Sequence, residues 1–411
     1  MTFKISEMKI EDTHRWDSYV NAHPKSNFYQ LSGWKSVIEN TYGHKTFYLK
    51  AVSEEIDERS ANNPFFESAS KSDEYVDRKA HATDSPGSND SSASGRGRNS
   101  TRIVGVLPLV HIKHFLFGNS LISIPFCDLG GVLADNEEIE GELLFEAVEL
   151  GKRLAASNIE IRNLKTIGNT ISKIGERDGR NNDRLRARWR SQRGSHKVRM
   201  VMELPDSSSK LMESFKSKLR SQIRKPAKEG VETRIGDTEL LNDFYRVFAI
   251  NMKDLGSPVH SKHLFFNLLK AFPDKSKVTV AYHDEKPVAG SIMLFFRDTV
   301  MNPWASFLKS HKKVSPNMLL YWSMLAYACD NGFKYFDFGR CTPGEGTFKF
   351  KEQWGASPEN LEYSYFSNNG SFDDTPISEK KIFKIGAEVW KRLPVVSTKI
   401  VGPAFRKYIG L

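Results

Sequence analysis

Residues 104–162 and 288–340 run through the same order of predicted elements, and this repeat limits the possible folds more than any other feature. The first copy reads as two strands, a helix and a short strand, at residues 104–112, 120–125, 142–156 and 159–162. The second copy has the same order, at residues 288–296, 299–305, 317–330 and 334–340. Each copy ends in an arginine, Arg162 or Arg340. Because one duplication explains both copies, we expect two related domains.

Strand, strand, helix, strand is the core order of a GNAT acyltransferase domain, in which the acyl donor usually lies where two central strands splay apart. The chain of 411 residues is also longer than one hydrophobic core usually supports. We therefore expect an α/β (α+β) fold with tandem GNAT-like domains, in which helices flank mixed sheets.

Two polar stretches mark the boundaries of the expected domains. A segment rich in Ser, Asn, Asp and Gly, at about 53–101, lacks the apolar residues needed to offset its ordering entropy. We expect it to be a disordered insertion in a first domain, 1–165. A basic linker, 166–197, is interpreted either as a solvated tether or as an RNA-contacting arm. The catalytic domain, 198–365, and a helical tail, 366–411, complete the chain.

The charge of the chain favours an anionic partner. The formal net charge is +10 and the pI is near 9.2, which suits RNA, a nucleotide-linked sugar, a phosphopantetheine carrier or an anionic membrane face. Three cysteines without a CxxC pair suggest neither a disulfide framework nor a metal site. The N-terminus lacks the apolar region of a signal peptide, so we expect a cytoplasmic protein. The tail is interpreted either as a helix docked on the second domain or as a helix that lies on the inner face of the membrane.

A basic stripe is predicted on a helix near the start of the second domain. Apolar residues recur every fourth position at Leu211, Phe215, Leu219 and Ile223, and cations recur with the same spacing at Lys216, Arg220, Arg224 and Lys228. Pro226 is expected to kink or end this helix near Lys225. The stripe is either the wet side of the helix or a phosphate-facing surface, and the second reading makes Arg224 and Lys225 candidate ligands.

The segment 336–351 carries the residues best suited to acyl-transfer chemistry. In the predicted strand ending at Arg340, alternation places Asp337 opposite two phenylalanines. After a tight turn, residues 347–351 read as a second alternating strand, with Lys349 and Lys351 on one side. A lysine held against aromatic walls is desolvated and would stabilise the oxyanion of a tetrahedral intermediate. The alternative is an edge strand with solvent-facing lysines. Cys341 has no evident base, so a thiol nucleophile is disfavoured.

These motifs resemble the FemAB family of aminoacyltransferases. The resemblance rests on Asp-Phe-Gly-Arg at 337–340, Phe-Lys-Phe-Lys at 348–351, Gln-Trp-Gly at 353–355 and the basic helix from Leu219. It is nearest to the FemAB-related proteins found with exosortase/PEP-CTERM exopolysaccharide systems, on the stretches that begin at Asp254 and Pro303. It covers about 1–52 and 102–365. The family shares a tandem GNAT fold and moves an amino acid from aminoacyl-tRNA to an amine of a peptidoglycan precursor. In it, the lysine of a Phe-Lys pair stabilises the reacting carbonyl, which implies that role for Lys351 of the pair Phe350-Lys351.

Two departures bear on the substrates. Where the peptidoglycan enzymes carry a precursor-binding lysine one turn beyond a first-domain tryptophan, this chain has Ile38 after Trp34, and it lacks their coiled-coil arm. Acyl-CoA usually requires a glycine-rich loop, and residues 311–317 contain no glycine. The donor is therefore aminoacyl-tRNA, acyl-CoA or an acyl carrier protein, with no bound cofactor and no metal.

The leading hypothesis is an N-acyltransferase that acts on an amine of a cell-envelope or exopolysaccharide precursor. The alternatives are an acyl-CoA or acyl-carrier-protein dependent GNAT enzyme and a non-catalytic polysaccharide- or RNA-binding module. Lys351 is the candidate catalytic residue. The candidate substrate-binding residues are Phe350, Lys349, Arg340, Asp337, Trp304, Asp254, Arg224, Lys225 and Arg162.

Overall fold

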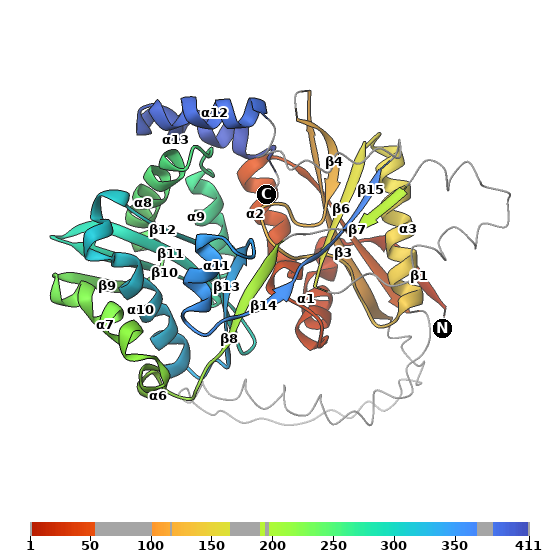
Figure 1. Ribbon diagram of the computed structural model, residues 1–411. Helices are drawn as coiled ribbons and strands as arrows, with labels where there is room; N and C mark the ends of the chain where they lie inside the picture. Colours follow the sequence, from red (N-terminus) through yellow and green to blue (C-terminus); the bar gives the residue numbers. More distant parts are fainter. Residues whose placement is uncertain are drawn as a thin grey trace, which may run out of the picture.

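Two sheets with their helices form two lobes that pack side by side (Figure 1). The computed structural model describes residues 2–53, 101–115, 117–164, 190–193, 197–367 and 381–409. The insertion expected at 53–101 lies outside this part of the chain except for its end residues. The basic arm expected at 166–197 also lies outside it, apart from residues 190–193 and 197.

The first sheet contains strands from both ends of the chain. Its spatial order is β1 (Phe3–Glu7), β2 (Lys45–Ser53), β3 (Arg102–His114), β4 (Gly118–Ile122), β6 (Asn158–Asn163), β15 (Glu362–Ser367) and β7 (Arg190–Arg193), and β5 (Leu133–Ala134) pairs with β3. The helix α3 (Glu137–Arg153) covers one face, and α1 (Thr13–Ala22) and α2 (Gly33–Tyr42) cover the other. β3 is buried along almost its whole length, as expected for a strand covered on both faces.

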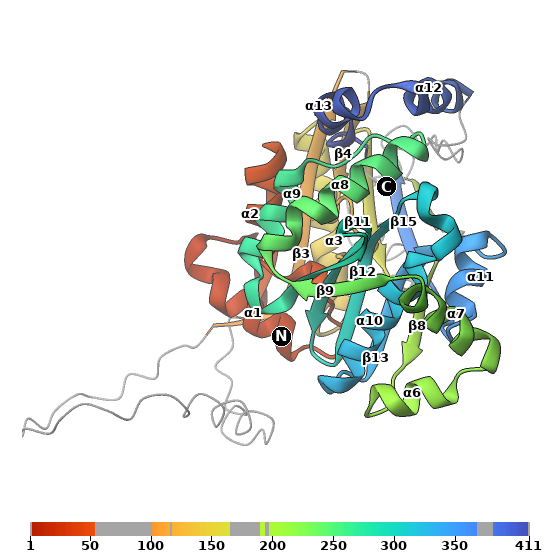
Figure 2. The same ribbon diagram turned by 90° about the vertical axis from the view of Figure 1, so that its left-hand side faces the viewer.

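The second sheet is built in the same way. Its order is β14 (Ser357–Asn360), β8 (Val198–Glu203), β13 (Tyr335–Cys341), β12 (Thr299–Phe307), β11 (Lys286–Phe296), β10 (Ser276–His283) and β9 (Val231–Gly236). One face is covered by α6 (Ser208–Ser214), α7 (Ser217–Lys228) and α10 (Pro316–Asp330), and the other by α8 (Leu241–Asp254) and α9 (Lys262–Ala271). Figure 2 shows α10 and α8 on opposite sides of this sheet. The short helix α11 (Gly346–Glu352) follows β13, and α12 (Lys381–Arg392) and α13 (Val395–Arg406) end the described chain.

The internal repeat predicted from the sequence is confirmed. In the first lobe, β3 and β4 are antiparallel, α3 follows, and β6 returns parallel to β4. In the second lobe, β11 and β12 are antiparallel, α10 follows, and β13 returns parallel to β12. The two lobes therefore share one topology, with mixed sheets flanked by helices.

Local signals explain where several elements begin and end. The side chain of Asn136 accepts a hydrogen bond from the backbone N–H of Ile139 and so caps α3, whose first turn is acidic and last turn basic. Gly43 ends α2 with φ of 69°, a left-handed conformation that glycine adopts without steric cost.

Three predictions about the second lobe are corrected. Residues 347–351 form the helix α11 rather than a strand, so Lys349 and Lys351 do not share a face. The basic helix is two helices, α6 and α7, because the backbone is extended at Phe215 and Lys216, and α7 continues past Pro226 to Lys228. Residues 362–365, assigned to the second domain, belong to β15 of the first sheet, because this strand crosses back to pair with β6.

One hydrophobic core joins the lobes. It lies between the two sheets and contains residues of α1, α2, α8 and α9, among them Trp34, together with Phe28 before α2 and Phe272 after α9. The Phe28 and Phe272 rings lie 4.6 Å apart between centroids. A Cβ on Gly33 would lie 2.6 Å from the Phe272 ring, so a glycine is needed where α2 approaches it.

Candidate active site

The candidate site begins where β12 and β13 separate. Their parallel pairing runs from Thr299↔Tyr335 to Met301↔Asp337, although β12 continues to Phe307 and β13 to Cys341. Beyond this point Gly339 has φ of 74°, and a Cβ there would lie 3.0 Å from the backbone oxygen of Asn302. Glycine is therefore required both for the conformation and for the close approach. The turn it makes directs two backbone carbonyls, those of Gly339 and Arg340, toward α11.

Lys351 reaches these carbonyls from α11. Its Nζ donates hydrogen bonds to the oxygen of Gly339 at 2.8 Å and to that of Arg340 at 2.9 Å. The residue is only 7% exposed. Burial lowers the pKa of Lys351 below its usual range, and Cys341 and Asp337 partly oppose this shift. A protonated lysine has three donors, so two can hold the carbonyls and one is left for another acceptor. The Lys351 ammonium therefore lies next to the end of β13, where two backbone carbonyls hold it.

Aromatic residues hold α11 in this position. Phe350 makes an edge contact with Tyr321 of α10 at 5.0 Å, and Tyr321 stacks on Phe338 at 5.7 Å. Trp354, which follows the helix, is fully buried in the same core. Phe350 is therefore a wall of the site, whereas Lys349 is exposed on the outer side of α11.

Asp337 supports the turn at Gly339. Its carboxylate accepts the backbone N–H of Gly339 at 2.8 Å and lies 3.4 Å from the guanidinium of Arg199. Arg199 also pairs with Glu359 of β14 at 2.6 Å. Burial raises the pKa of Asp337, and the charge of Arg199 partly opposes the shift. These contacts assign Asp337 to orienting the carbonyls that Lys351 binds.

The first lobe reaches the site through Asp128, which the sequence analysis missed as a site residue. Its carboxylate accepts the backbone N–H of Arg340 at 3.2 Å and lies 3.3 Å from the Arg340 Nε. Its own backbone oxygen accepts the Tyr363 hydroxyl of β15 at 3.0 Å. A polar residue that interrupts the apolar run 115–133 was the available signal, but its partner lies more than two hundred residues away.

Arg162 occupies the position in the first lobe that is equivalent to that of Arg340 in the second lobe. The Arg162 side chain is buried, with 1% of its surface exposed. The parallel pairing of β4 and β6 ends at Ile122↔Glu160. Arg162 then donates to the backbone oxygen of Cys127 at 2.6 Å and to Glu160 at 2.7 Å. The ring of Tyr363 lies 5.6 Å from its guanidinium carbon. In the first lobe, the space where β4 and β6 separate is therefore filled by protein groups. The space where β12 and β13 separate in the second lobe is the better candidate for a substrate site.

Trp304 and Asp254 do not lie with Lys351. Trp304 belongs to the core between the sheets, where it contacts Phe265 at 5.3 Å, whereas Phe338 and Trp354 belong to the core on the opposite face. Asp254 ends α8, and its backbone oxygen accepts the Lys309 ammonium at 3.2 Å.

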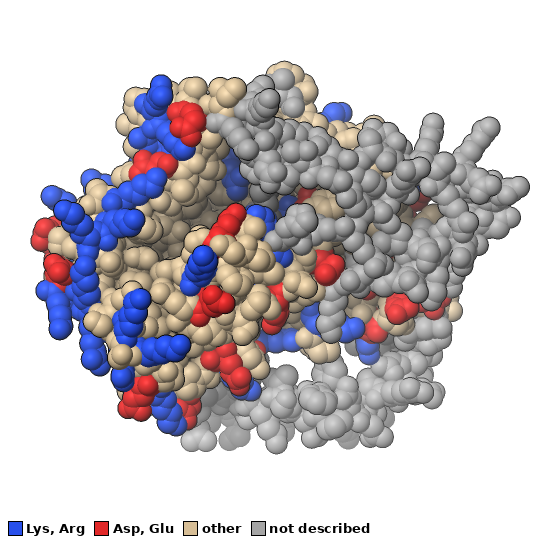
Figure 3. Space-filling model, viewed as in Figure 1, with Lys and Arg blue, Asp and Glu red and all other residues tan. Residues whose placement is uncertain are grey.

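The basic stripe of α7 lies beside the N-terminus of α10. Arg224 and Lys225 are exposed, and Lys225 donates at 2.8 Å to the backbone oxygen of Lys313, in the short helix Lys309–Val314 that leads into α10. Among the described residues no carboxylate pairs with Arg220, Arg224 or Lys228. Figure 3 shows a hollow in the second lobe between α12 and α11, with Lys and Arg gathered along the outer edge of the lobe. These charges would attract an anionic group.

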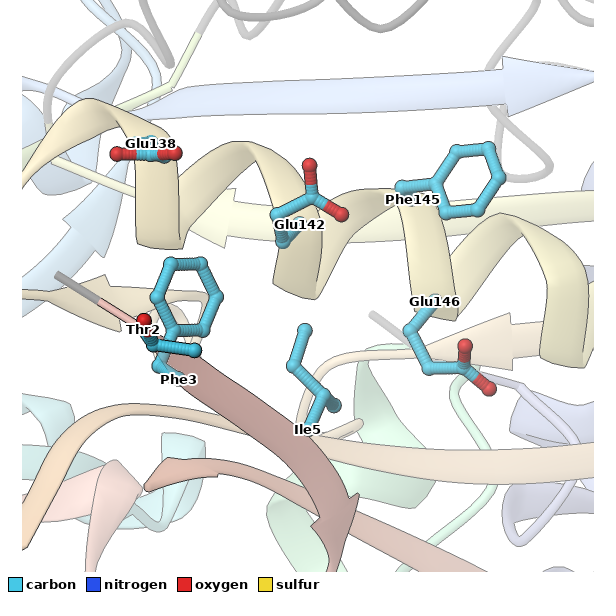
Figure 4. A pocket seen from close by; sticks show the side chains of 7 residues that line it. All are labelled: Thr2, Phe3, Ile5, Glu138, Glu142, Phe145 and Glu146. Atoms are coloured by element: carbon cyan, nitrogen blue, oxygen red, sulfur yellow. The ribbon is translucent and has the colours of Figure 1, made fainter. Parts of the chain in front are cut away.

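A separate pocket on the first lobe does not suit an anionic substrate. It lies between β1 and α3 (Figure 4), and its walls combine Phe3, Ile5 and Phe145 with Glu138, Glu142 and Glu146. The acidic side chains would repel a phosphate or a nucleic acid.

Comparisons with known proteins agree with this description. Residues 213–352, which include β12, β13 and Lys351, match the acetyltransferase (GNAT) domain family. A structure of FemX is similar at a TM-score of 0.57 and 14% identity, covering 89% of this chain and 98% of FemX. A conserved protein of unknown function from Bacteroides thetaiotaomicron is similar at a TM-score of 0.50 and 9% identity, covering 89% of this chain and all of that chain. No curated protein sequence matches the chain.

The fold and the domain match together define the class. The chain is a mixed α/β protein with two GNAT-like lobes, and its second lobe carries the matched GNAT domain. The fold class predicted from the sequence is thereby confirmed. FemX shares this fold with the chain along most of its length. The domain match and the position of Lys351 within it support an acyltransferase.

Proposed function

We propose that the chain is an N-acyltransferase that transfers an aminoacyl or acyl group to an amine of a cell-envelope or exopolysaccharide precursor. The observation that carries this proposal is the buried ammonium of Lys351, held by two carbonyls at the point where β12 and β13 separate. Acyl transfer to an amine passes through a tetrahedral oxyanion, and a fixed cation in a desolvated site stabilises such a charge. The fold shared with FemX is compatible with an aminoacyl donor.

The donor is proposed to carry phosphate groups. The α7 stripe and the lysines before α10 form one exposed basic edge beside the candidate site. Aminoacyl-tRNA fits this edge best, since residues 311–317 lack the glycine loop expected for coenzyme A. Acyl-CoA and an acyl carrier protein are the other donors with suitable charge. A ligand that binds the folded chain raises its melting temperature, so comparing charged tRNA with coenzyme A tests the choice.

The decisive experiment is Lys351→Met. Methionine keeps most of the side-chain volume but removes the ammonium, so turnover should fall by roughly 10² to 10³, the usual effect of losing one oxyanion donor. Turnover is measured with each candidate donor and an amine acceptor, and circular dichroism checks the fold.

Lys349→Met is the matched control, because Lys349 lies on the same helix but is exposed. It should leave turnover close to that of the unmodified chain. Equal turnover in the Lys351→Met and Lys349→Met variants would remove Lys351 from the mechanism.

A further inference from the structure

Among the side chains that the structure describes, those of the C-terminal helices α12 and α13 pack on the second lobe through one face. Both contact α8. On α13, Thr398 is 1% exposed, and a Cβ on Gly402 would lie 3.0 Å from Val259. On α12, the backbone and Cβ of Ala387 lie against Gly256. Each helix thus already buries one face against the lobe, as an amphipathic surface helix normally does with its apolar face.

The opposite face of each helix is also apolar. On α13, Val396 is 69% exposed and Ile400 is 73% exposed, and on α12 the values for Ile385 and Val389 are 66% and 57%. A face turned toward water would carry polar side chains at these positions. Four exposed aliphatic residues on two adjacent helices therefore indicate that something other than water covers this surface.

The hairpin between β3 and β4 adds a third apolar segment. Phe115 at its tip is 88% exposed. The hairpin leans on the tail, since the His114 ring lies 4.3 Å from that of Tyr408, and Phe117 stacks on the same ring at 6.1 Å. Both views place the hairpin and the two helices at one end of the molecule (Figures 1 and 2). Three segments from distant parts of the sequence therefore present apolar side chains at the same end.

The charges of the tail are mostly positive. Residues 381–411 contain seven Lys or Arg and a single acid, Glu388, which pairs with Lys391. Arg392 on α12 and Lys113 beside the hairpin tip are exposed. Exposed apolar side chains with a basic rim match a bilayer surface that carries anionic headgroups. A second copy of the chain would fit poorly, because a two-fold contact through this face would bring the same positive charges together.

We propose that α12, α13 and the β3–β4 hairpin form a docking surface for an anionic lipid bilayer. The helices lie in the headgroup region with Ile385, Val389, Val396 and Ile400 toward the acyl chains. None of the helices in the described part of the chain is both long and apolar enough to cross a membrane. It holds the hollow below α12 close to the headgroups (Figure 3).

The test is flotation of the full chain with vesicles of phosphatidylcholine alone or mixed with phosphatidylglycerol. The chain should float with the mixed vesicles, and less so as salt is raised. Replacing Val396 and Ile400 together by Asp should weaken this binding by at least about tenfold, since the apolar area is no longer buried. Ile10, which is 92% exposed in the first lobe, supplies the control Ile10→Asp, and this variant should bind as the unmodified chain does.

A second variant tests the charge without changing an apolar side chain. Arg392→Glu with Lys113→Glu should reduce binding to the mixed vesicles by about fivefold or more per reversed charge. Turnover on soluble substrates should not change in either double variant. The proposal is overturned if the full chain fails to float with phosphatidylglycerol vesicles, or if both double variants float as well as the control. It is also overturned if light scattering shows a dimer that Val396→Asp with Ile400→Asp converts to monomers.

Discussion

At the scale of single residues, burial sets the chemistry of the ionisable groups. Lys351 and Arg162 are basic side chains in the protein interior, and each donates hydrogen bonds to backbone carbonyls, while burial lowers the pKa of Lys351. His260 instead stays neutral. Arg406 donates to its Nε2 at 3.0 Å, so the ring proton is on Nδ1, which faces the Tyr42 hydroxyl at 2.9 Å. The three side chains come from α13, the loop after α8, and α2.

This arrangement predicts a loss of stability in mild acid. Burial and the charge of Arg406 hold the pKa of His260 well below its usual range. Below about pH 6.5 this histidine therefore binds a proton in the unfolded chain but not in the folded chain. The free energy of unfolding then decreases as the pH falls, by up to about 1.4 kcal/mol per pH unit. His260→Gln keeps an acceptor for Arg406 but does not titrate. Urea unfolding at pH 7.5 and 5.5 should show a smaller decrease in this variant than in the unmodified chain.

His23 and His44 also have lowered pKa values because of burial. They decrease the stability in acid equally in the unmodified chain and in the His260→Gln variant. The difference between the two proteins therefore isolates His260. An equal loss of stability in both would show that His260 is protonated in the folded chain.

At the scale of elements, the end of β13 is the part that the site depends on most. Gly339→Ala should cost about 1–2 kcal/mol for the left-handed backbone, and the new methyl group must also displace the backbone of Asn302. Because the carbonyls of Gly339 and Arg340 hold Lys351, turnover should fall by more than the loss of folded protein explains. Thermal unfolding and turnover on the same preparations measure both effects.

Gly344→Ala supplies the comparison. Gly344 has φ of 82° in the turn before α11, but a Cβ there would meet nothing within 4 Å. The Gly344→Ala variant should lose stability because of the left-handed backbone, but it should not lose additional turnover. Equal turnover in the two variants would contradict the role given to the Gly339 turn.

At the scale of the whole molecule, the two lobes are joined by a shared core and by a strand that follows the second lobe but pairs in the first sheet. The core between the sheets draws on both lobes, β15 carries the end of the second lobe back into the first sheet, and Asp128 binds Arg340 across the boundary. We therefore expect a single cooperative unfolding transition rather than one for each lobe. Calorimetry and tryptophan fluorescence should give coincident curves. Two resolved transitions would mean that the shared core contributes little.

The sequence predicted the order of elements in the repeat well, but it predicted a strand where α11 is a helix and one basic helix where α6 and α7 are two. Strand and helix periods in residues 104–162 and 288–340 were strong enough to reveal the repeat, and the structure confirms it. The alternation of Phe and Lys at 348–351 indicated a strand, yet α11 is a helix. Two residues of each kind are too few to separate the two periods. Contacts of Phe350 and Trp354 with Tyr321, far away in the sequence, accompany the helical form.

The sequence by itself determined the duplicated topology, the excess of positive charge and the presence of a Phe-Lys pair after the second repeat, because these are properties of order, composition and local spacing. Only the tertiary structure decided that Arg162 fills the first splay, that Asp128 joins Arg340 and that the tail helices keep an apolar outer face. Each of these depends on which distant segments pack together. Burial then determines whether a charged or apolar side chain supports the fold, serves the site or remains open to a partner.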